Sequence, residues 1–144
     1  MKKIINGKVY DTNTAELLGT YSSPDSVTDF SHFEESLYRK RTGEFFLFGQ
    51  GGPSSRYAAQ VGQNNWSSGS KILPLTWDGA RFWVEHHLEA EDYEKIFGPV
   101  AEDDSRVAVN LSLPASSVEK ARRAAAKSSM SLSTFIDSLI SSVC

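Results

Sequence analysis

The feature that most limits the fold of this chain is a run near the C-terminus, from Arg106 to Pro114, in which apolar residues alternate with small or polar ones. Side chains of a strand point alternately to opposite sides, so the run predicts one β-strand with a single apolar face. The residues of that face are Val107, Val109, Leu111 and Leu113. Pro114 ends the strand, because proline has no amide hydrogen to donate.

Two helical patterns follow the strand. Ser116 or Ser117 can cap a first helix that runs to about Lys127, and Ser131 can cap a second helix. The apolar stripe of the first helix consists of Val118, Ala121, Ala124 and Ala125. The apolar residues of the second helix are Leu132, Phe135, Ile136, Leu139 and Ile140. Residues 128–130 separate the two helices.

One strand and two short helices cannot bury enough surface to be stable alone. The strand also has two open edges and no partner within its own segment. Pairing with the same strand of a second copy removes both problems, since it creates a two-stranded ribbon over a shared four-helix core. The segment from Arg106 to Cys144 therefore predicts a homodimer.

This order of elements, with LSLP before the first helix and SSMSLSTFI opening the second, resembles the Arc/MetJ-type ribbon-helix-helix family over residues 106–144. Ser129 departs from the pattern, because such modules often have glycine in this turn. The resemblance implies that the paired strands enter the major groove of duplex DNA. It implies a dimer core of Val107, Val109, Leu111, Leu113, Leu132, Phe135, Ile136, Leu139 and Ile140.

The resemblance also assigns the residues that would contact DNA. The outward side chains of the ribbon are Ala108, Asn110 and Ser112, with Arg106 at its end. Asparagine can pair with adenine, serine with several base edges, and an alanine methyl with the thymine methyl. The backbone amides near Ser131, Leu132 and Ser133 should hold a phosphate at the start of the second helix. Only Asn110 among the outward-facing residues between the ends of the ribbon is large and polar, so a module that serves solely as a dimerisation clasp is the alternative.

The remaining residues have a different composition and indicate a separate domain. Fifteen of the sixteen aromatic residues lie at or before Phe97. Residues 1–98 contain ten Lys and Arg against thirteen Asp and Glu, whereas residues 106–144 contain five against two. Residues 99–105 carry three acidic groups and predict a solvated linker. We therefore expect a body at 1–98, an acidic linker at 99–105 and the ribbon-helix-helix module at 106–144.

The sequence patterns of the body predict an α+β fold, in which helices pack on a small antiparallel sheet. Asn6-Gly7 and Thr42-Gly43 indicate hairpins between strands 3–5 and 8–10 and between strands 36–41 and 44–48. The strand 44–48 is apolar on both faces, which is typical of an internal strand. A further strand is expected at 71–75, and a short helix from Thr12 or Asn13 to Leu18.

Two more helices are expected at the end of the body. Thr76 can cap the first, whose buried stripe would consist of Trp77, Ala80, Val84, His87 and Leu88. The second is expected from Ala90 to Phe97 and ends at Gly98-Pro99.

Side chains with catalytic or metal-binding chemistry do not form a recognisable pattern in the body. His86 and His87 are adjacent on a helix and point about 100 degrees apart, and His32 is distant in sequence. The glycine run from Gly49 to Pro53 lacks the Gly-Lys-Ser/Thr ending of a phosphate loop. We expect no enzymatic activity, no metal and no cofactor. No apolar run is long enough for a membrane span or a signal peptide, and the single cysteine, Cys144, fits a reducing, cytoplasmic location.

Arg56 and Trp66 are the two candidate partner-binding residues of the body. Arg56 can meet an anion or an acidic partner, and Trp66 stands alone in a polar run, as a binding anchor often does. The segments YDTNTAELLG, ESLYRKRTGEFFLFGQGGPSSRYA and LTWDGARFWVEHHLEAEDYEKIFG resemble a small module of conjugative-element and phage proteins of Gram-positive bacteria. Some small proteins of that setting are anti-CRISPR proteins.

Two functions follow as hypotheses from these features. The first is a dimeric DNA-binding transcription regulator of a mobile genetic element, whose body binds a partner. The second is a protein inhibitor of a host defence nuclease, whose C-terminal module serves as a dimerisation clasp. The expected partners are a second copy of the chain, duplex DNA, and a protein such as a toxin or a CRISPR effector.

Overall fold

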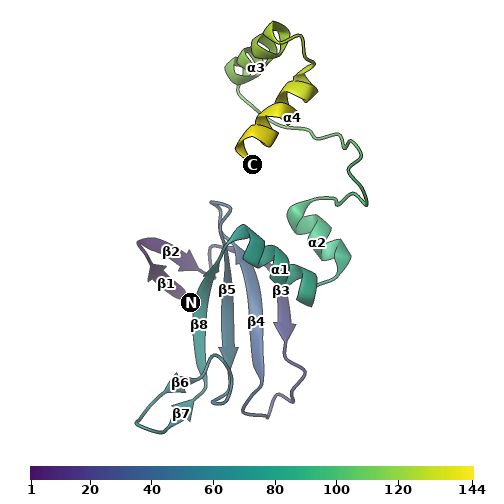
Figure 1. Cartoon of the computed structure of the whole chain (residues 1–144). Coiled ribbons are helices and arrows are strands. Elements are labelled where there is room, and N and C mark those ends of the chain that lie inside the picture. Colours follow the sequence, from purple (N-terminus) through teal and green to yellow (C-terminus); the bar gives the residue numbers. More distant parts are fainter. The chain divides into compact units, whose positions relative to one another are not determined.

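The computed structural model describes all 144 residues and divides the chain into two compact units, Met1–Val100 and Ala101–Cys144 (Figure 1). The first unit contains eight strands and two helices, and the second contains two helices. The expected α+β class is therefore confirmed. None of the helices combines the length and the apolar character that crossing a membrane requires.

The main sheet of the body has four antiparallel strands in the order β3–β4–β5–β8, with bounds Glu16–Ser22, Phe33–Arg39, Phe45–Gly51 and Gly69–Leu75. The hairpin around Thr42-Gly43 is confirmed as β4 and β5, which pair from Arg39 and Phe45 onward. The strand β5 is internal, as its apolar residues on both faces predict. Phe46 and Leu47 are both buried, although they lie on opposite sides of the sheet.

Two small hairpins accompany the main sheet. The expected first hairpin is present as β1 (Lys2–Ile5) and β2 (Lys8–Asp11). Asn6 and Gly7 both have positive φ angles, 51° and 76°, as a two-residue hairpin turn of this kind requires. The second hairpin, β6 (Ala59–Gln60) and β7 (Trp66–Ser67), was not expected from the sequence.

The helices α1 (Trp77–His87) and α2 (Ala90–Phe97) pack on one face of the sheet (Figure 1). Thr76 caps α1 as expected, because its hydroxyl accepts the amide hydrogen of Gly79 at 3.0 Å. The buried core of this face consists of Leu37, Phe45, Leu47, Ala80, Trp83 and Val84. The expected stripe was wrong at one position, since Trp83 is buried and Trp77 is 55% exposed.

The opposite face of the sheet carries a second, smaller core of Tyr10, Phe46 and Ile72. The ring of Tyr10 meets Phe46 edge-on at 5.5 Å between centroids, and Tyr38 stacks on Phe46 at 5.3 Å. The hairpin of β1 and β2 thus supplies the cover for this face, since Tyr10 lies on β2.

The helix expected from Thr12 or Asn13 to Leu18 was wrong, because this stretch contains a turn and the start of β3. The amide hydrogens of Asn13 and Ala15 are accepted by the side chain and the carbonyl of Asp11, which closes the turn. Gly19, the residue after this stretch, lies inside β3. A β-carbon there would approach Leu88 to 2.6 Å, so glycine allows the close packing of the segment after α1 on this strand.

The second unit contains α3 (Ala115–Lys127) and α4 (Leu132–Val143), preceded by residues 106–114 without helix or strand. The expected capping of α3 by Ser116 or Ser117 was wrong, because the helix begins at Ala115 after Pro114, whose carbonyl accepts the first helical amide hydrogens. Ser131 caps α4 as expected, and its hydroxyl accepts the Thr134 amide hydrogen at 3.2 Å.

Candidate functional site

The second unit leaves a large apolar surface without a cover. The four apolar residues of the expected ribbon strand, Val107, Val109, Leu111 and Leu113, are between 54% and 71% exposed. A groove of about 780 Å³ lies between this segment and α4, where Ser133, Ile136, Asp137 and Ile140 line it. Burial of one valine or leucine side chain contributes about 1.5–3 kcal/mol, so this exposure is costly in an isolated chain.

The helix pair buries its expected apolar stripe only in part. Ala125 is buried, and Val118, Ala121, Ala124, Leu132, Phe135 and Ile136 are half-buried. Leu139 and Ile140, which we expected in a dimer core, are exposed. Within one chain, α3 therefore packs against the start of α4, and no other element covers the end of α4.

The residues expected to contact DNA are accessible in this unit. Arg106, Ala108, Asn110 and Ser112 are all exposed. The Ser131 hydroxyl is occupied by the cap, since it also donates a hydrogen bond to the Thr134 hydroxyl at 2.9 Å. The amides of Leu132 and Ser133 are the first of the helix and have no acceptor within it, which leaves them available for an anion.

The basic side chains of the second unit other than Arg106 belong to α3. Lys120, Arg122, Arg123 and Lys127 are exposed, and Arg123 pairs with Glu119 one turn earlier in the helix. Lys127 has no acidic partner within ion-pair distance. The charge available to a phosphate therefore comes chiefly from Lys120, Arg122 and Lys127, since Arg123 is already paired.

In the body, the two expected partner-binding residues lie in different surroundings. Trp66 lies on β7, opposite Gln60 of β6, and it is 55% exposed. Arg56 lies in the turn after β5, and its guanidinium lies 4.7 Å from the centroid of the Phe33 ring. Trp66 therefore presents an apolar surface, whereas Arg56 already has an aromatic neighbour.

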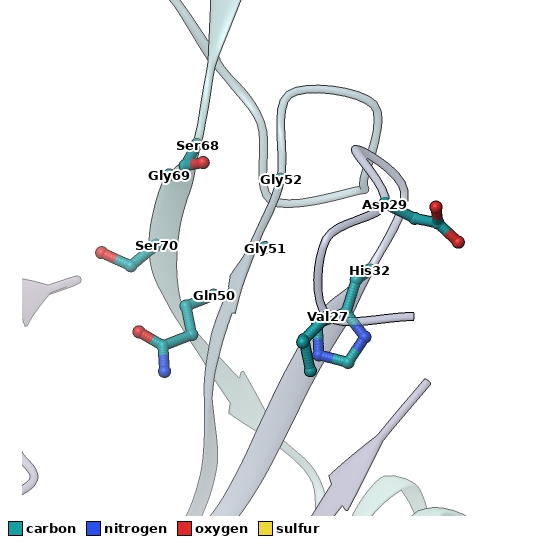
Figure 2. Close-up of a pocket in the computed structure, with 9 residues that line it drawn as sticks. All are labelled: Val27, Asp29, His32, Gln50, Gly51, Gly52, Ser68, Gly69 and Ser70. Atoms are coloured by element: carbon teal, nitrogen blue, oxygen red, sulfur yellow. The ribbon is translucent and has the colours of Figure 1, made fainter. Parts of the chain in front are cut away.

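An open polar cavity of about 430 Å³ lies at the end of the sheet where β5 ends and β8 begins (Figure 2). Its lining residues are Val27, Asp29, His32, Gln50, Gly51, Gly52, Ser68, Gly69 and Ser70. Gln50 and Ser70 are direct neighbours on β5 and β8. Asp29 accepts the Ser26 amide hydrogen at 3.2 Å, so its carboxylate supports its own loop. The cavity thus brings together polar side chains of β5 and β8 and the loop-bound side chains of Asp29 and His32.

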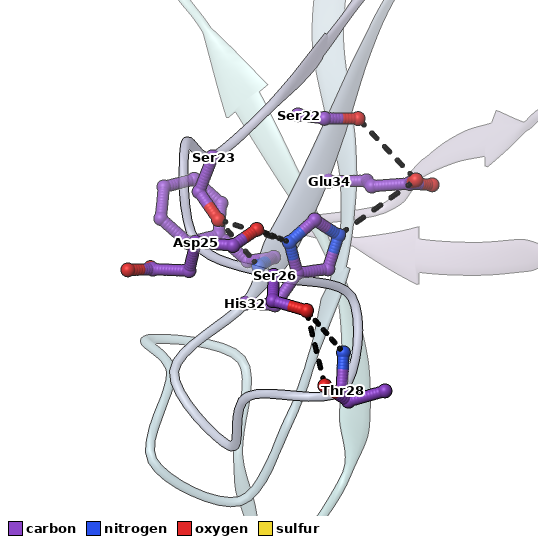
Figure 3. Close-up of polar contacts among 8 residues, drawn as sticks. Ser22, Ser23, Asp25, Ser26, Thr28, His32 and Glu34 are labelled. Atoms are coloured by element: carbon purple, nitrogen blue, oxygen red, sulfur yellow. Dashed lines mark hydrogen bonds and ion pairs between the residues drawn. The ribbon is translucent and has the colours of Figure 1, made fainter.

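His32 anchors the loop between β3 and β4, which lines part of this cavity (Figure 3). Its Nδ1 lies 3.0 Å from the Asp25 carbonyl oxygen and 3.3 Å from the Ser23 hydroxyl. A carbonyl oxygen can only accept, so this contact places the proton on Nδ1 and leaves Nε2 facing Glu34 at 3.9 Å. The other histidines stack on aromatic rings at 3.9 Å, His86 on Phe82 and His87 on Tyr21. No group of three metal-binding side chains forms in the chain.

The most unusual site of the body was missed in the sequence, and it centres on Glu35 of β4. This carboxylate is 3% exposed, and it accepts hydrogen bonds from the Tyr57 hydroxyl and, at 3.3 Å, from the Trp83 indole. Burial raises the pKa of the Tyr57 hydroxyl, and the hydrogen bond to Glu35 adds to the shift, so Tyr57 stays a donor. The alternation of β4 could have revealed the site, because it places Glu35 on the same face as Leu37.

The comparisons with known proteins give no relative. No family model matches the chain, and neither a curated protein nor a solved structure matches it.

Proposed function

We propose that this protein is a homodimeric DNA-binding regulator, in which residues 106–144 of two copies form a ribbon-helix-helix module. One observation carries the proposal: the strand-like alternation of residues 106–114 has its entire apolar face exposed beside an uncovered helix. A soluble chain rarely keeps such a surface unless another molecule covers it. A second copy offers the same strand and the same helix end, and two such strands can pair with each other.

Three features of the second unit favour nucleic acid as the ligand of such a dimer. The outward face of the segment is uncharged and accessible at Ala108, Asn110 and Ser112, which suits contact with base edges. The start of α4 offers free amides to a phosphate. Residues 106–144 carry five basic groups against two acidic ones, so the module attracts a polyanion although the whole chain has a net charge of -3.

The test is a fluorescence anisotropy titration of the full-length protein with labelled duplex DNA over a salt series. The duplexes are the upstream region of the protein's own gene and a scrambled duplex of equal length. We expect tighter binding to the upstream region and a linear fall of log affinity with log salt. The same affinity for both duplexes, or no binding at low salt, contradicts the proposal.

The second candidate, a protein inhibitor that uses the module only as a clasp, has support from the body. Val27, Phe30, Val61 and Trp66 are exposed large apolar residues, all in the loops and the small hairpin of the body. Apolar and aromatic side chains of this kind are common anchors of protein interfaces. A dimer that binds no DNA but retains a host protein in a pull-down would favour this candidate.

A further inference from the structure

The buried carboxylate of Glu35 accepts fewer hydrogen bonds than a carboxylate can accept. Its carboxylate is buried and accepts two hydrogen bonds, one from Tyr57 and one from Trp83. A carboxylate has about four positions for hydrogen bond donors, so two of them are not used by donors of the protein. A buried carboxylate without a hydrogen-bonded cation is costly, which means that Glu35 has unused capacity for a positive group.

Neighbouring aromatic rings form a row from Tyr57 to Trp83, the two donors to this carboxylate, and we call this row the aromatic wall. The centroid of Phe33 lies 6.1 Å from that of Tyr57 and 6.2 Å from that of Tyr21. Tyr21 stacks on His87 at 3.9 Å, and His87 meets the ring of Trp83 edge-on at 5.2 Å. The faces of aromatic rings attract cations, and they attract the flat guanidinium group in particular.

A guanidinium group already lies at this site, and it belongs to Arg56 of the same chain. Arg56 lies 4.7 Å from the centroid of Phe33 and, through Nη1, 3.7 Å from Glu35. The second distance is too long for a hydrogen bond, so Arg56 supplies charge but none of the missing donors. Its side chain is 62% exposed, and an ion pair with one exposed member contributes little.

We propose that Glu35 and its aromatic wall form a receptor site for an arginine side chain of a partner protein, which displaces Arg56. The incoming guanidinium can donate two parallel hydrogen bonds to the carboxylate, which Arg56 does not do from its position in the turn. Arginine fits better than lysine, because the site offers a ring face for stacking as well as a carboxylate. Arg56, once released, is free to pair with a carboxylate of the same partner.

The charges around the site are consistent with a monovalent cation. Burial lowers the pKa of His87, so this histidine is neutral at pH 7 and does not compete with the ligand. Tyr57 is also neutral, because its pKa is raised. Glu35 is the carboxylate that accepts hydrogen bonds from both ends of the wall, and one guanidinium balances its charge.

The test uses methylguanidinium chloride as the probe and the full-length protein. The readout is the indole N–H signal of Trp83 in two-dimensional NMR, because this group donates to Glu35 and senses any new donor there. Trp66→Phe and Trp77→Phe assign the signal. Sodium chloride at equal concentration serves as the blank for ionic strength.

We expect a saturable shift of the Trp83 signal, with binding about two- to fivefold tighter in Arg56→Ala than in the unaltered protein, the range that loss of an exposed ion pair allows. The matched control is Arg81→Ala, since Arg81 lies 5.6 Å from the centroid of Trp77 but away from Glu35, and it should leave the affinity unchanged. Glu35→Gln in the Arg56→Ala background should abolish the shift.

Phe33→Leu in the same background tests the wall if the Glu35→Gln variant does not fold, and it should weaken binding. The proposal is overturned if Arg56→Ala shows no saturable shift, or if sodium chloride alone produces the same shift. Equal affinity with and without the Glu35 carboxylate or the Phe33 ring also overturns it.

Discussion

The phenol ring of Tyr57 occupies the place where any residue other than glycine would have its β-carbon at position 49. Gly49 lies within β5 opposite Glu35 of β4, and Tyr57 crosses it to reach the Glu35 carboxylate. Packing therefore explains the glycine at position 49, because an aromatic ring lies directly on the backbone of β5 there.

Gly49→Ala should destabilise the protein by about 1–3 kcal/mol, the usual cost of forcing an additional carbon into a packed core. The Tyr57 ring would have to move and would weaken its hydrogen bond to Glu35. Gly62→Ala is the matched control, since the nearest atom to its added carbon is 3.4 Å away. Urea unfolding followed by circular dichroism measures both variants, and an unchanged midpoint in Gly49→Ala would contradict the packing described here.

Leu111→Asp should convert the dimer into a monomer, because it places a charge in the apolar face that we propose two chains share. Ser112→Asp is the matched control on the opposite face of the same segment and should remain dimeric. The truncation 1–100 should also be monomeric. Size-exclusion chromatography with light scattering determines the mass in each case, and a monomeric unaltered protein at micromolar concentration would remove the basis of the proposed dimer.

Asn110→Ala should weaken binding to the cognate duplex by about 1–3 kcal/mol and relax the preference at one base position. Lys127→Ala should instead weaken binding to all duplexes alike and reduce the slope of log affinity against log salt by about one. Anisotropy titrations with cognate and scrambled duplexes separate the two effects. If both variants lose affinity equally for both duplexes, Asn110 does not read a base.

Ser129→Gly should stabilise the second unit by up to about 1 kcal/mol. Ser129 has a φ of 55°, in the left-handed region that costs a non-glycine residue about 1–2 kcal/mol, and the greater freedom of glycine in the unfolded chain offsets part of the gain. Ser128→Gly is the control, because Ser128 has a φ of -94° and gains nothing from glycine. Thermal unfolding should show a higher midpoint for Ser129→Gly and a lower one for Ser128→Gly.

The stability of the body should fall as the pH decreases below about 6.5, the ordinary pKa of histidine. Burial lowers the pKa of His87, Glu35 opposes the shift, and His86 and Arg56 add to it. The unfolded chain therefore binds a proton at a higher pH than the folded chain, so stability is full above the ordinary pKa and is lost toward acid. Urea unfolding at several pH values should show this slope reduced in His87→Phe and retained in His86→Gln.

Local signals in the sequence predicted most of the elements of the body. Asn6-Gly7 identified the first hairpin because the turn needs two positive φ angles. Thr76 identified the start of α1, and Gly98 the end of α2, because both act through contacts within a few residues. These interactions are short in sequence and do not depend on the rest of the fold.

The errors arose where distant parts of the chain decide the structure. Thr12 or Asn13 can cap a helix that runs to Leu18, but pairing with β4 makes the end of this stretch a strand, with a register shift between Leu17 and Gly19. Trp77 and Trp83 are both apolar residues of one helix, and only the position of the sheet decides which one is buried. The alternation of β4 can place Glu35 on the buried face of the sheet, but the site joins a strand, a turn and a helix. No local pattern therefore predicts the hydrogen bonds of Glu35 with Tyr57 and Trp83.

The order of the main sheet also has a kinetic consequence. Each of β3, β4 and β5 pairs with its neighbour in sequence, and β8 joins after a single excursion through residues 52–68. Such pairing closes short loops, and proteins with mainly local contacts fold quickly. The body can therefore reach its native structure in a first-order reaction on one chain. In the proposed dimer, residues 106–144 fold in a bimolecular step, so the rate of their refolding should rise with protein concentration while that of the body does not.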